Sequence, residues 1–314
     1  MRGILIQNRG LLTTVQDLGR KGFRRYGMPV SGAMDKFSMQ CANWLVGNRR
    51  TDPVLEATLA GPSVEFLSAV NFSITGAEAV ATLDGRPVEE WKCIRARKGS
   101  LLEIAPFIAG ARIYCFRGWN KLDLIMGSAS TYLPGKTGGH HGREIRKGDI
   151  LTFKNKGSLV IKKRSVPIQE RPVFARSVQL RVLPGVNFDL FSESDRDILL
   201  GEEYAISTNS DRMGFRLEGR ALEEAPFKKE LLSYGIQMGA IQVPGDGKPI
   251  IMGADAQTTG GYRQFANVIT ADLDHLAQMK PSDRVNFKIT DPDFAIEMLQ
   301  KKQGYIDQLF RKTV

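Results

Sequence analysis

The chain has 314 residues, of which 42% are hydrophobic and 25% are charged, a composition typical of a globular protein with one large or two ordinary domains. Its net charge of +10 is spread over short basic clusters, which argues against a nucleic-acid-binding protein and suits the attraction of a small anionic substrate. The three cysteines have no paired spacing, which argues against a disulfide framework and a zinc site. Because no apolar run approaches the length of a signal peptide or a membrane span, we expect a cytoplasmic protein that does not contact membranes.

The first unusual stretch is LTTVQDLGRKGFRRYGMPVSGAMD, residues 12–35. Four glycines and one proline alternate there with polar and charged side chains, a density of breakers that the interior of a helix or strand does not tolerate. The stretch therefore predicts a short strand over about residues 11–15 that leads into a long shaped loop. Such loops often carry sites, although an ordinary solvated connection is the alternative.

A helix is predicted next, over residues 36–46, because its apolar residues fall on one arc. Asp35 is well placed as the N-cap and Gly47 as the residue that ends the helix, although Asp35 could instead belong to a site. From residue 54 to residue 153, and again at residues 159–161, the sequence predicts short strands with frequent turns, among them the hairpin signal Asp84-Gly85. This pattern favours a barrel or a sandwich.

A domain boundary is plausible within residues 163–176, which contain two prolines and mixed charge. A second strand-rich region follows, with a partly helical segment at 187–200 and a helix at 271–279. An amphipathic helix from about residue 292 closes the chain. Similar turn sequences in the two halves suggest two related domains, residues 1–165 and 166–314. We thus predict a mainly β protein of two barrels with a few peripheral helices.

Two polar stretches resemble known motifs only in part. Gly135-Lys136-Thr137 matches the end of a phosphate-binding loop, but the first required glycine is replaced by Ser130 and no helix pattern follows. The adjacent His140 and His141 would point to opposite faces of a strand, so an exposed turn without a metal is expected.

His275 lies opposite the apolar arc of its predicted helix, which predicts a solvated side chain.

Two later stretches carry candidate binding groups. In residues 209–214, a carboxylate beside a guanidinium could orient a planar polar substrate, or could simply form an ion pair that fixes a turn. In residues 255–262, an amide, two hydroxyls and a phenol surround a Gly-Gly turn, which could equally be a plain solvated turn. The scarcity of histidine weighs against a serine or cysteine hydrolase triad.

Six stretches, taken together and in order, closely resemble the biotin-dependent carboxyltransferase-like family, once called the allophanate hydrolase subunit 2 family. They are TTVQDLGRKGFRRYGMPVSGAMD (13–35), ANWLVGN (42–48), LEATLAGP (55–62), GGHHGREIRKGD (138–149), SDRMGFRLEG (210–219) and DAQTTGGY (255–262). The resemblance implies two cyclophilin-like β-barrel subdomains. It also implies partners, because members of the family act with a B subunit and an A subunit to hydrolyse 5-oxoproline to glutamate with ATP.

Related modules transfer a carboxyl group from biotin to urea, but this chain has no biotin-accepting Ala-Met-Lys-Met segment, so any biotin would be carried by another chain. The leading hypothesis is therefore the C subunit of an ATP-dependent 5-oxoprolinase, inactive alone. One alternative is a regulatory protein that antagonises a kinase inhibitor related to the B subunit. Another is a carboxyltransferase component that acts on a urea-like substrate.

The resemblance, together with the chemistry of flat amides, suggests roles for ten residues. A lactam-opening site needs donors for the carbonyl oxygen, a cation and a proton-handling carboxylate. The catalytic candidates are Asp17, Asp211 and Arg212. The substrate-binding candidates are Gln16, Arg20, Asn43, Gln242, Gln257, Thr258 and Tyr262. We expect these residues, drawn from both halves, to share one cleft.

Overall fold

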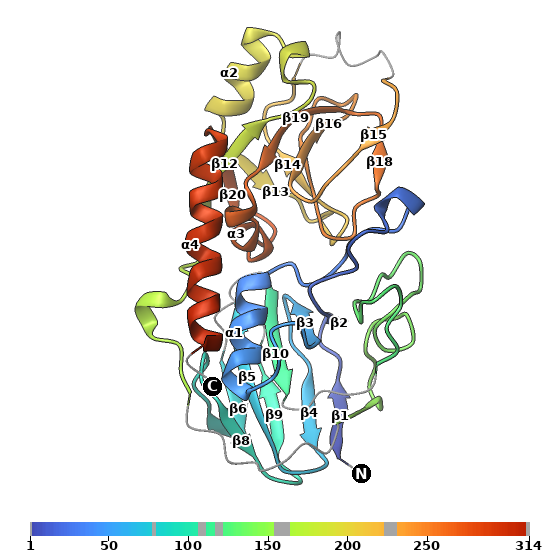
Figure 1. Ribbon diagram of the computed structural model, residues 1–314, viewed down its shortest axis with the longest axis vertical. Coiled ribbons are helices and arrows are strands. Elements are labelled where there is room, and N and C mark those ends of the chain that lie inside the picture. Colours follow the sequence, from blue (N-terminus) through green and yellow to red (C-terminus); the bar gives the residue numbers. More distant parts are fainter. Residues whose placement is uncertain are drawn as a thin grey trace. The chain divides into compact units, whose positions relative to one another are not determined.

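The computed structural model describes residues 2–76, 80–105, 111–116, 122–153, 164–222 and 231–311 (Figure 1). The chain forms two compact units. Unit 1 comprises residues 1–20, 31–174 and 306–314, and unit 2 comprises residues 21–30 and 175–305. Whereas the sequence suggested two contiguous domains, 1–165 and 166–314, the chain passes between the units more than once. A strand expected at residues 159–161 lies outside the described part.

The strands of unit 1 form two antiparallel sheets. One has the order β11-β1-β4-β9-β6-β7, and the other has the order β2-β3-β10-β5-β8. Their bounds are β1 Gly3–Asn8, β2 Leu12–Gln16, β3 Val54–Thr58, β4 Ser63–Phe66, β5 Val70–Gly76, β6 Ala81–Leu83, β7 Arg86–Pro87, β8 Ile94–Ala96, β9 Leu101–Ile104, β10 Ala111–Phe116 and β11 Ile150–Thr152. The described strands thus form two sheets around a common core instead of one closed ring of hydrogen bonds.

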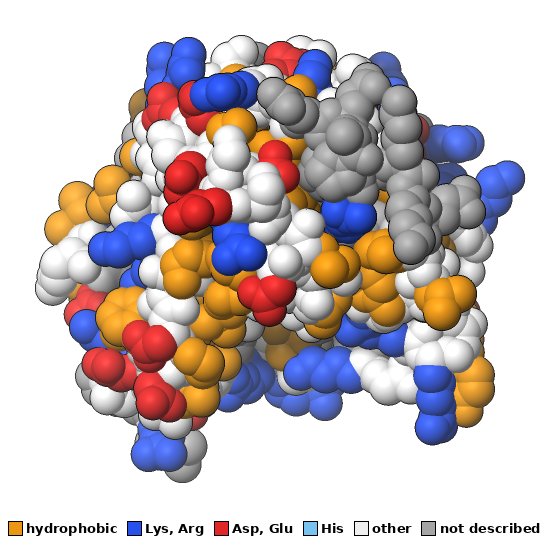
Figure 2. All heavy atoms as spheres, turned by 90° about the horizontal axis from the view of Figure 1, so that it is seen from above, with side chains coloured by type: hydrophobic (Ala, Val, Ile, Leu, Met, Phe, Trp, Pro, Cys, Tyr) orange, Lys and Arg blue, Asp and Glu red, His pale blue; other side chains and the backbone are white. Residues whose placement is uncertain are grey.

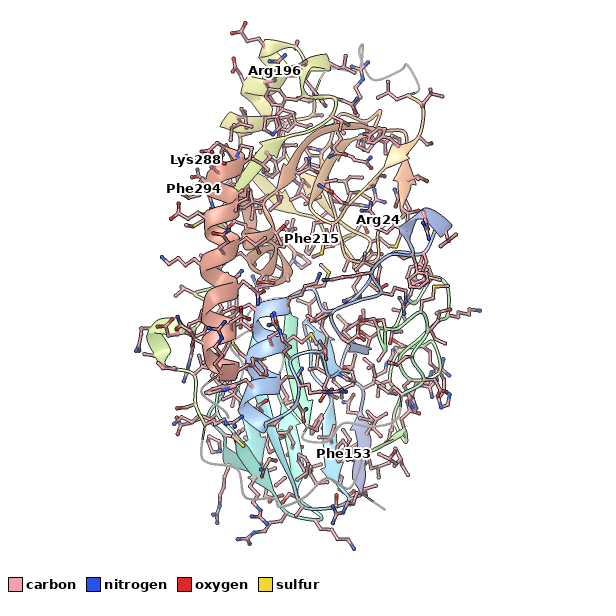
Figure 3. All side chains as sticks on the ribbon, in the orientation of Figure 1. Arg24, Phe153, Arg196, Phe215, Lys288 and Phe294 are labelled. Atoms are coloured by element: carbon pink, nitrogen blue, oxygen red, sulfur yellow. The ribbon has the colours of Figure 1, made fainter. Side chains whose placement is uncertain are left out.

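The core of unit 1 is apolar and rich in aromatic rings. It includes Ile4, Leu55, Phe66 and Phe72, all inaccessible to solvent. Phe153, labelled in Figure 3, stacks on Phe116 with 5.7 Å between the ring centroids. Alternating strand residues supply this core because successive side chains point to opposite faces of a strand.

Helix α1, Lys36–Val46, packs on the five-stranded sheet of unit 1 (Figure 1). Thr75 of β5 donates a hydrogen bond to the carbonyl of Ser38 over 2.9 Å. Asp35 accepts from the Ser38 amide over 2.8 Å, and Gly47 ends the helix with a φ of 74°. The predicted helix and both of its caps are confirmed, and Asp35, at 0% exposure, has the structural role.

Unit 2 contains a closed barrel with the order β12-β19-β16-β17-β14-β13-β20. Its strands are β12 Ser177–Pro184, β13 Tyr204–Ile206, β14 Gly214–Glu218, β16 Ala240–Val243, β17 Ile250–Met252, β19 Arg263–Val268 and β20 Arg284–Ile289. A separate two-stranded ribbon joins β15, Tyr234–Gly235, to β18, Thr259–Gly260. The prediction of a mainly β chain with strand-rich halves is confirmed.

Helices of unit 2 lie outside the barrel. Helix α2, Glu193–Gly201, follows the short 3-10 helix Phe188–Leu190 and begins with a capping box between Ser192 and Asp195. The 3-10 turn Thr270–Asp272 leads into α3, Leu273–Ala277, so the predicted helix at 271–279 is present but shorter.

The side chain of His275 in helix α3 is less exposed than the sequence suggests. Burial lowers the pKa of His275 in α3, with Lys302 adding to the effect, so the expectation of a solvated side chain is wrong. Helix α4, Pro292–Arg311, begins in unit 2, where the guanidinium of Arg181 lies 5.3 Å from the ring centroid of Phe294 (Figure 3). Its residues 306–311 belong to unit 1, where Ile306 and Leu309 are buried.

Charged side chains are mixed over the surface that Figure 2 draws, where Lys and Arg alternate with Asp, Glu and apolar groups. The described part of the chain contains no helix with the length and apolar composition that crossing a bilayer requires.

Candidate functional site

In unit 1, Asp17 holds a loop segment, residues 128–131, against the end of β2. Its carboxylate accepts hydrogen bonds from the amides of Gly19 and Ala129 and from the hydroxyls of Ser128 and Ser130, all over 2.6–2.7 Å. A carboxylate with four donors has little capacity left to take a proton from a substrate. These contacts favour a positioning role for Asp17 over the predicted role as a base.

Gln16 and Arg20 flank Asp17 and contact the same segment. Arg20, at 1% exposure, donates from Nη2 to the carbonyl of Ser130 over 2.5 Å. Gln16 donates to the Thr14 hydroxyl over 3.0 Å and to the Thr131 carbonyl over 3.2 Å. Among the residues that the structure describes, the buried Gln16 Oε1 has no hydrogen-bond partner. The structure thus brings three predicted residues of the opening stretch together, against one segment.

A glycine-rich turn, residues 138–142, packs against the same segment and against Arg20. A Cβ on Gly138 would lie 2.1 Å from the carbonyl oxygen of Ser130 and 2.8 Å from Arg20 Nη2. A Cβ on Gly139 would lie 1.9 Å from Thr131 Oγ1. Both glycines also have a positive φ, which L side chains rarely adopt. The turn therefore depends on the absence of side chains at both positions.

This turn forms one wall of a pocket of about 370 Å³ within unit 1. Apolar side chains, two imidazoles, a carboxylate and the outer strand β11 line it. The lining residues are Leu122, Asp123, Ile125, Gly138, Gly139, His140, His141, Gly142, Ile150, Leu151 and Thr152. Concave sites with an apolar lining and a few polar groups are the usual places for small ligands. The stretch Gly135-Lys136-Thr137 is a turn closed by the Tyr132–Thr137 bridge, so rejecting it as a phosphate loop is confirmed.

The two histidines of the pocket lie close together. Their ring centroids are 4.3 Å apart with the planes at 62°, because His141 has a φ of 59° and the chain turns there. In a strand the two rings would point to opposite faces, but the chain turns here and the rings lie side by side. The expected turn is confirmed, but His140 is partly buried and faces the pocket.

Asp149 lies beside His140 and is itself firmly held. Arg143 binds both carboxylate oxygens over 2.7 and 2.8 Å, and the amide of Arg146 donates over 2.8 Å. Burial alone would raise the pKa of Asp149, but these hydrogen bonds lower it to about 2. Its Oδ1 is 3.6 Å from His140 Nε2. Burial lowers the pKa of His140, and Asp149 opposes the shift.

Asn43 does not take part in this cluster. It lies in α1 at 0% exposure, donates to the carbonyl of Asp52 over 2.7 Å, and accepts from Asn48 over 3.1 Å. These contacts fix the turn after the helix, so they favour a structural role over the predicted substrate-binding role.

In unit 2, the two motif stretches meet through a buried ion pair. Arg212 donates from Nε and Nη2 to the two oxygens of Asp255 over 2.9 and 3.3 Å. The amide of Asp255 in turn donates to the carbonyl of Arg212 over 2.9 Å. Asp211 is exposed and accepts from the amide of Met213 over 2.8 Å, which caps the turn. Asp255 was not predicted, although its place at the start of the DAQTTGGY stretch was the available signal.

The candidate amides of unit 2 gather around Gly260. A Cβ there would lie 3.6 Å from the amide nitrogen of Gln242 and 3.7 Å from that of Gln257. Gln242, at 1% exposure, donates to the carbonyl of Tyr262 over 3.4 Å, and its Oε1 has no partner among the described residues. Gln257 and the ring of Tyr262 are exposed, so solvent reaches this group of side chains on one side.

Tyr234 joins this group from the neighbouring ribbon, and sequence patterns did not single it out. Its hydroxyl donates to the carbonyl of Tyr262, and burial raises its pKa, opposed by hydrogen bonds with Gln242 and the backbone of Gln264. Thr258 is buried nearby, where its carbonyl accepts from the amide of Ile236 over 2.9 Å. The structure thus brings Gln16, Asp17 and Arg20 together in unit 1, and it brings Gln242, Gln257 and Tyr262 together in unit 2. The expectation of one shared cleft stays a prediction.

The family model for the carboxyltransferase domain, subdomains A and B, matches residues 26–289. The chain belongs to this family. It is 38% identical over 300 residues to the 5-oxoprolinase C subunit of Haemophilus influenzae, covering 95% of this chain and 94% of that protein. It is 36% identical over 301 residues to the 5-oxoprolinase C subunit of Escherichia coli, covering 96% and 95% of the two chains.

The fold of this carboxyltransferase-domain protein is also found in a much larger enzyme. The crystal structure of the K. lactis urea amidolyase matches it with a TM-score of 0.92 and 26% identity, covering 98% of this chain and 20% of that one. Within the described residues, no group of three or more His, Cys, Asp or Glu side chains could hold a metal ion.

Proposed function

We propose that this chain is the C subunit of an ATP-dependent 5-oxoprolinase, which hydrolyses 5-oxoproline to glutamate together with an A subunit and a B subunit in the cytoplasm. The observation that carries the proposal is the identity of 38% and 36%, over nearly the full length of each chain, to two proteins named as the C subunit of 5-oxoprolinase. Identity over the whole length supports a shared role better than a shared fold would.

The chemistry of the reaction fits the groups that the chain presents. A lactam is hard to open at neutral pH, because its nitrogen is a poor leaving group. Transfer of a phosphoryl group from ATP to the carbonyl oxygen activates the ring carbon for attack by water. In unit 2, Gln242 and Gln257 lie together as neutral hydrogen-bonding groups of the kind that small-molecule sites contain. Arg212 is neutralised by Asp255, so we assign this pair a structural role.

Reconstitution tests the proposal. The purified chain, mixed with A and B subunits, should release phosphate from ATP only when 5-oxoproline is present, and glutamate should form in equal amount. Leaving out this chain should abolish both products, and the chain alone should form neither. Full turnover by A and B alone would contradict the proposal. A tight complex with the B subunit, without turnover, would instead favour a regulatory binding protein.

A second candidate is a component that transfers a carboxyl group to a urea-like substrate. The observation in its favour is the fold match to the K. lactis enzyme, supported by 32% identity to the Saccharomyces cerevisiae urea amidolyase over 88% of this chain and 16% of that protein. The same reconstituted mixture, supplied with urea and with a chain that carries already carboxylated biotin, should then transfer the carboxyl group to urea, regenerate free biotin and leave 5-oxoproline unchanged.

A further inference from the structure

We propose that the pocket of unit 1 binds the flat amide substrate and that His140 is the group that accepts the amide proton, with Asp149 as its positioning residue. This inference rests on the proposed function and adds to it the site in this chain where the amide is activated. It starts from the position of the imidazole, on the wall of a pocket of about 370 Å³.

The surroundings of His140 resemble those of a base held by a carboxylate. Asp149 Oδ1 lies 3.6 Å from Nε2 of the ring, and Arg143 fixes Asp149 through two hydrogen bonds. The 3.6 Å separation is longer than a hydrogen bond, but the nearby carboxylate favours the tautomer with the proton on Nε2, which leaves the lone pair of Nδ1 to accept another. A base of this kind, oriented by a third group, is typical of catalytic sites.

Burial lowers the pKa of His140 and so favours the neutral imidazole, although the ring still lines the pocket. Asp149 favours the protonated ring, whereas Arg143 and His141 oppose it, and the strong Arg143–Asp149 pair leaves little net charge at that side. Asp123 lines the pocket, and the guanidinium of Arg20 lies behind the bare backbone of Gly138. The neutral imidazole therefore has an unprotonated ring nitrogen with which to accept a proton.

The walls also limit the class of substrate. Leu122, Ile125 and Leu151 make one part apolar, and the two imidazoles offer flat faces. Such a lining suits a small planar or cyclic amide with an N–H to present to His140. Among the described residues of the wall there is no lysine or arginine, so a highly charged phosphate is expected to approach from outside the pocket.

The proposed step moves one phosphoryl group and one proton. The amide oxygen attacks the terminal phosphorus of a nucleoside triphosphate, an O–P bond forms, and the bond to the bridging oxygen breaks so that the diphosphate leaves with the electron pair. At the same time the amide N–H bond breaks, and its proton passes to Nδ1 of His140. The products are an O-phosphorylated imidate, a nucleoside diphosphate and an imidazolium ring.

The variant His140→Gln tests this step in the reconstituted complex. Glutamine keeps a polar side chain but cannot accept the proton, so kcat should fall by about 100-fold or more with KM little changed. The acid limb of the kcat/KM profile, caused by protonation of His140, should disappear. His275→Gln is the matched control, because His275 is also a partly buried histidine with a lowered pKa but lies in unit 2. It should retain wild-type turnover.

The variant Asp149→Asn tests the positioning role. Asp149 raises the pKa of His140, so its loss should move the acid limb to lower pH and reduce kcat by about tenfold. A purely structural role would lower the yield of folded protein without moving the limb. An unchanged limb in folded Asp149→Asn would refute the positioning role.

A measurement on the chain alone separates this inference from the proposed function. In the histidine-labelled chain, 5-oxoproline should shift the imidazole signals of His140 and leave those of His275 in place. An inactive wild-type complex would count against the proposed function. An active complex in which His140→Gln keeps turnover within about threefold, or in which 5-oxoproline leaves the His140 signals unchanged, would overturn the role of His140.

Discussion

The buried ion pair between Arg212 and Asp255 stabilises the fold, whatever part the predicted catalytic residue Arg212 takes in the reaction. Both side chains are buried, at 8% and 2% exposure, and each satisfies the other through two hydrogen bonds. Removing one partner would leave a buried charge without compensation, which costs more than the pair contributes to stability.

We therefore expect Arg212→Ala or Asp255→Ala to lower the free energy of unfolding by about 3–5 kcal/mol, measured by urea denaturation. The double variant Arg212→Met with Asp255→Leu should recover part of this loss, because it leaves no unpaired charge. The exposed pair of Arg220 and Glu202, 3.7 Å apart, is the control, and its disruption should cost at most about 1 kcal/mol. Equal losses at the two pairs would contradict this account.

Residue roles were the hardest part to predict from the sequence. Asp35 was assigned correctly, because an N-cap depends on neighbours within four residues. Asp17 and Arg212 were found as unusual residues, but their partners lie 111 and 43 positions away for Ser128 and Asp255. A local sequence pattern does not reveal contacts between residues so far apart in the chain. The polar stretches could therefore be located from the sequence, but the hydrogen-bond partners and roles of their side chains could not be predicted.

At the scale of the elements, the turn at residues 138–142 owes its shape to close backbone packing. Gly139 and Gly148 both have a positive φ, of 55° and 88°. Only Gly139 has a neighbour in the way, since a Cβ there would lie 1.9 Å from Thr131 Oγ1, whereas a Cβ on Gly148 would meet nothing within 4 Å. The two positions therefore separate backbone strain from steric conflict.

We expect Gly148→Ala to destabilise the protein by about 1–2 kcal/mol, the usual cost of the left-handed conformation for a residue with a Cβ. Gly139→Ala should cost clearly more and should also abolish the effect of 5-oxoproline on His140. Thermal unfolding and histidine NMR of both variants check this. If the two substitutions prove equally mild, the close packing of the turn against residue 131 is not required.

The elements themselves were well predicted where the pattern is local. The helix at 36–46 was found from its apolar arc and its caps, and the short strands from their composition. Strand order was not predictable, because β1 pairs with β11 across more than a hundred residues and a sequence pattern does not specify partners at that distance. The pocket beside β11 was missed for the same reason.

At the scale of the whole molecule, the two partly buried histidines link stability to pH. The pKa of His140 and that of His275 are both lowered in the folded state, chiefly by burial, so the unfolded chain binds more protons near pH 6. Their contribution is fully present above the unfolded pKa of about 6.5 and is lost as the pH falls below it. Asp149, with a pKa of about 2, loses its contribution only below pH 3.8.

The urea midpoint should accordingly be lower at about pH 5.5 than at about pH 7.5. In the double variant His140→Gln with His275→Gln the drop should be smaller, because glutamine does not titrate in this range. The quantity to compare between the wild type and the double variant is the fall in urea midpoint from the higher to the lower pH. If both proteins lose the same stability, the histidines are not responsible.

The path of the chain through the two units has a consequence for biosynthesis. Residues 306–314 belong to unit 1, and Ile306 and Leu309 are buried there. A ribosome makes the N-terminal end first, and domains that are contiguous in sequence can fold before synthesis ends. Here unit 1 is complete only after residues 306–311 have been made, so a nascent chain stalled before residue 306 should still bind chaperones, however much of its β structure has already formed.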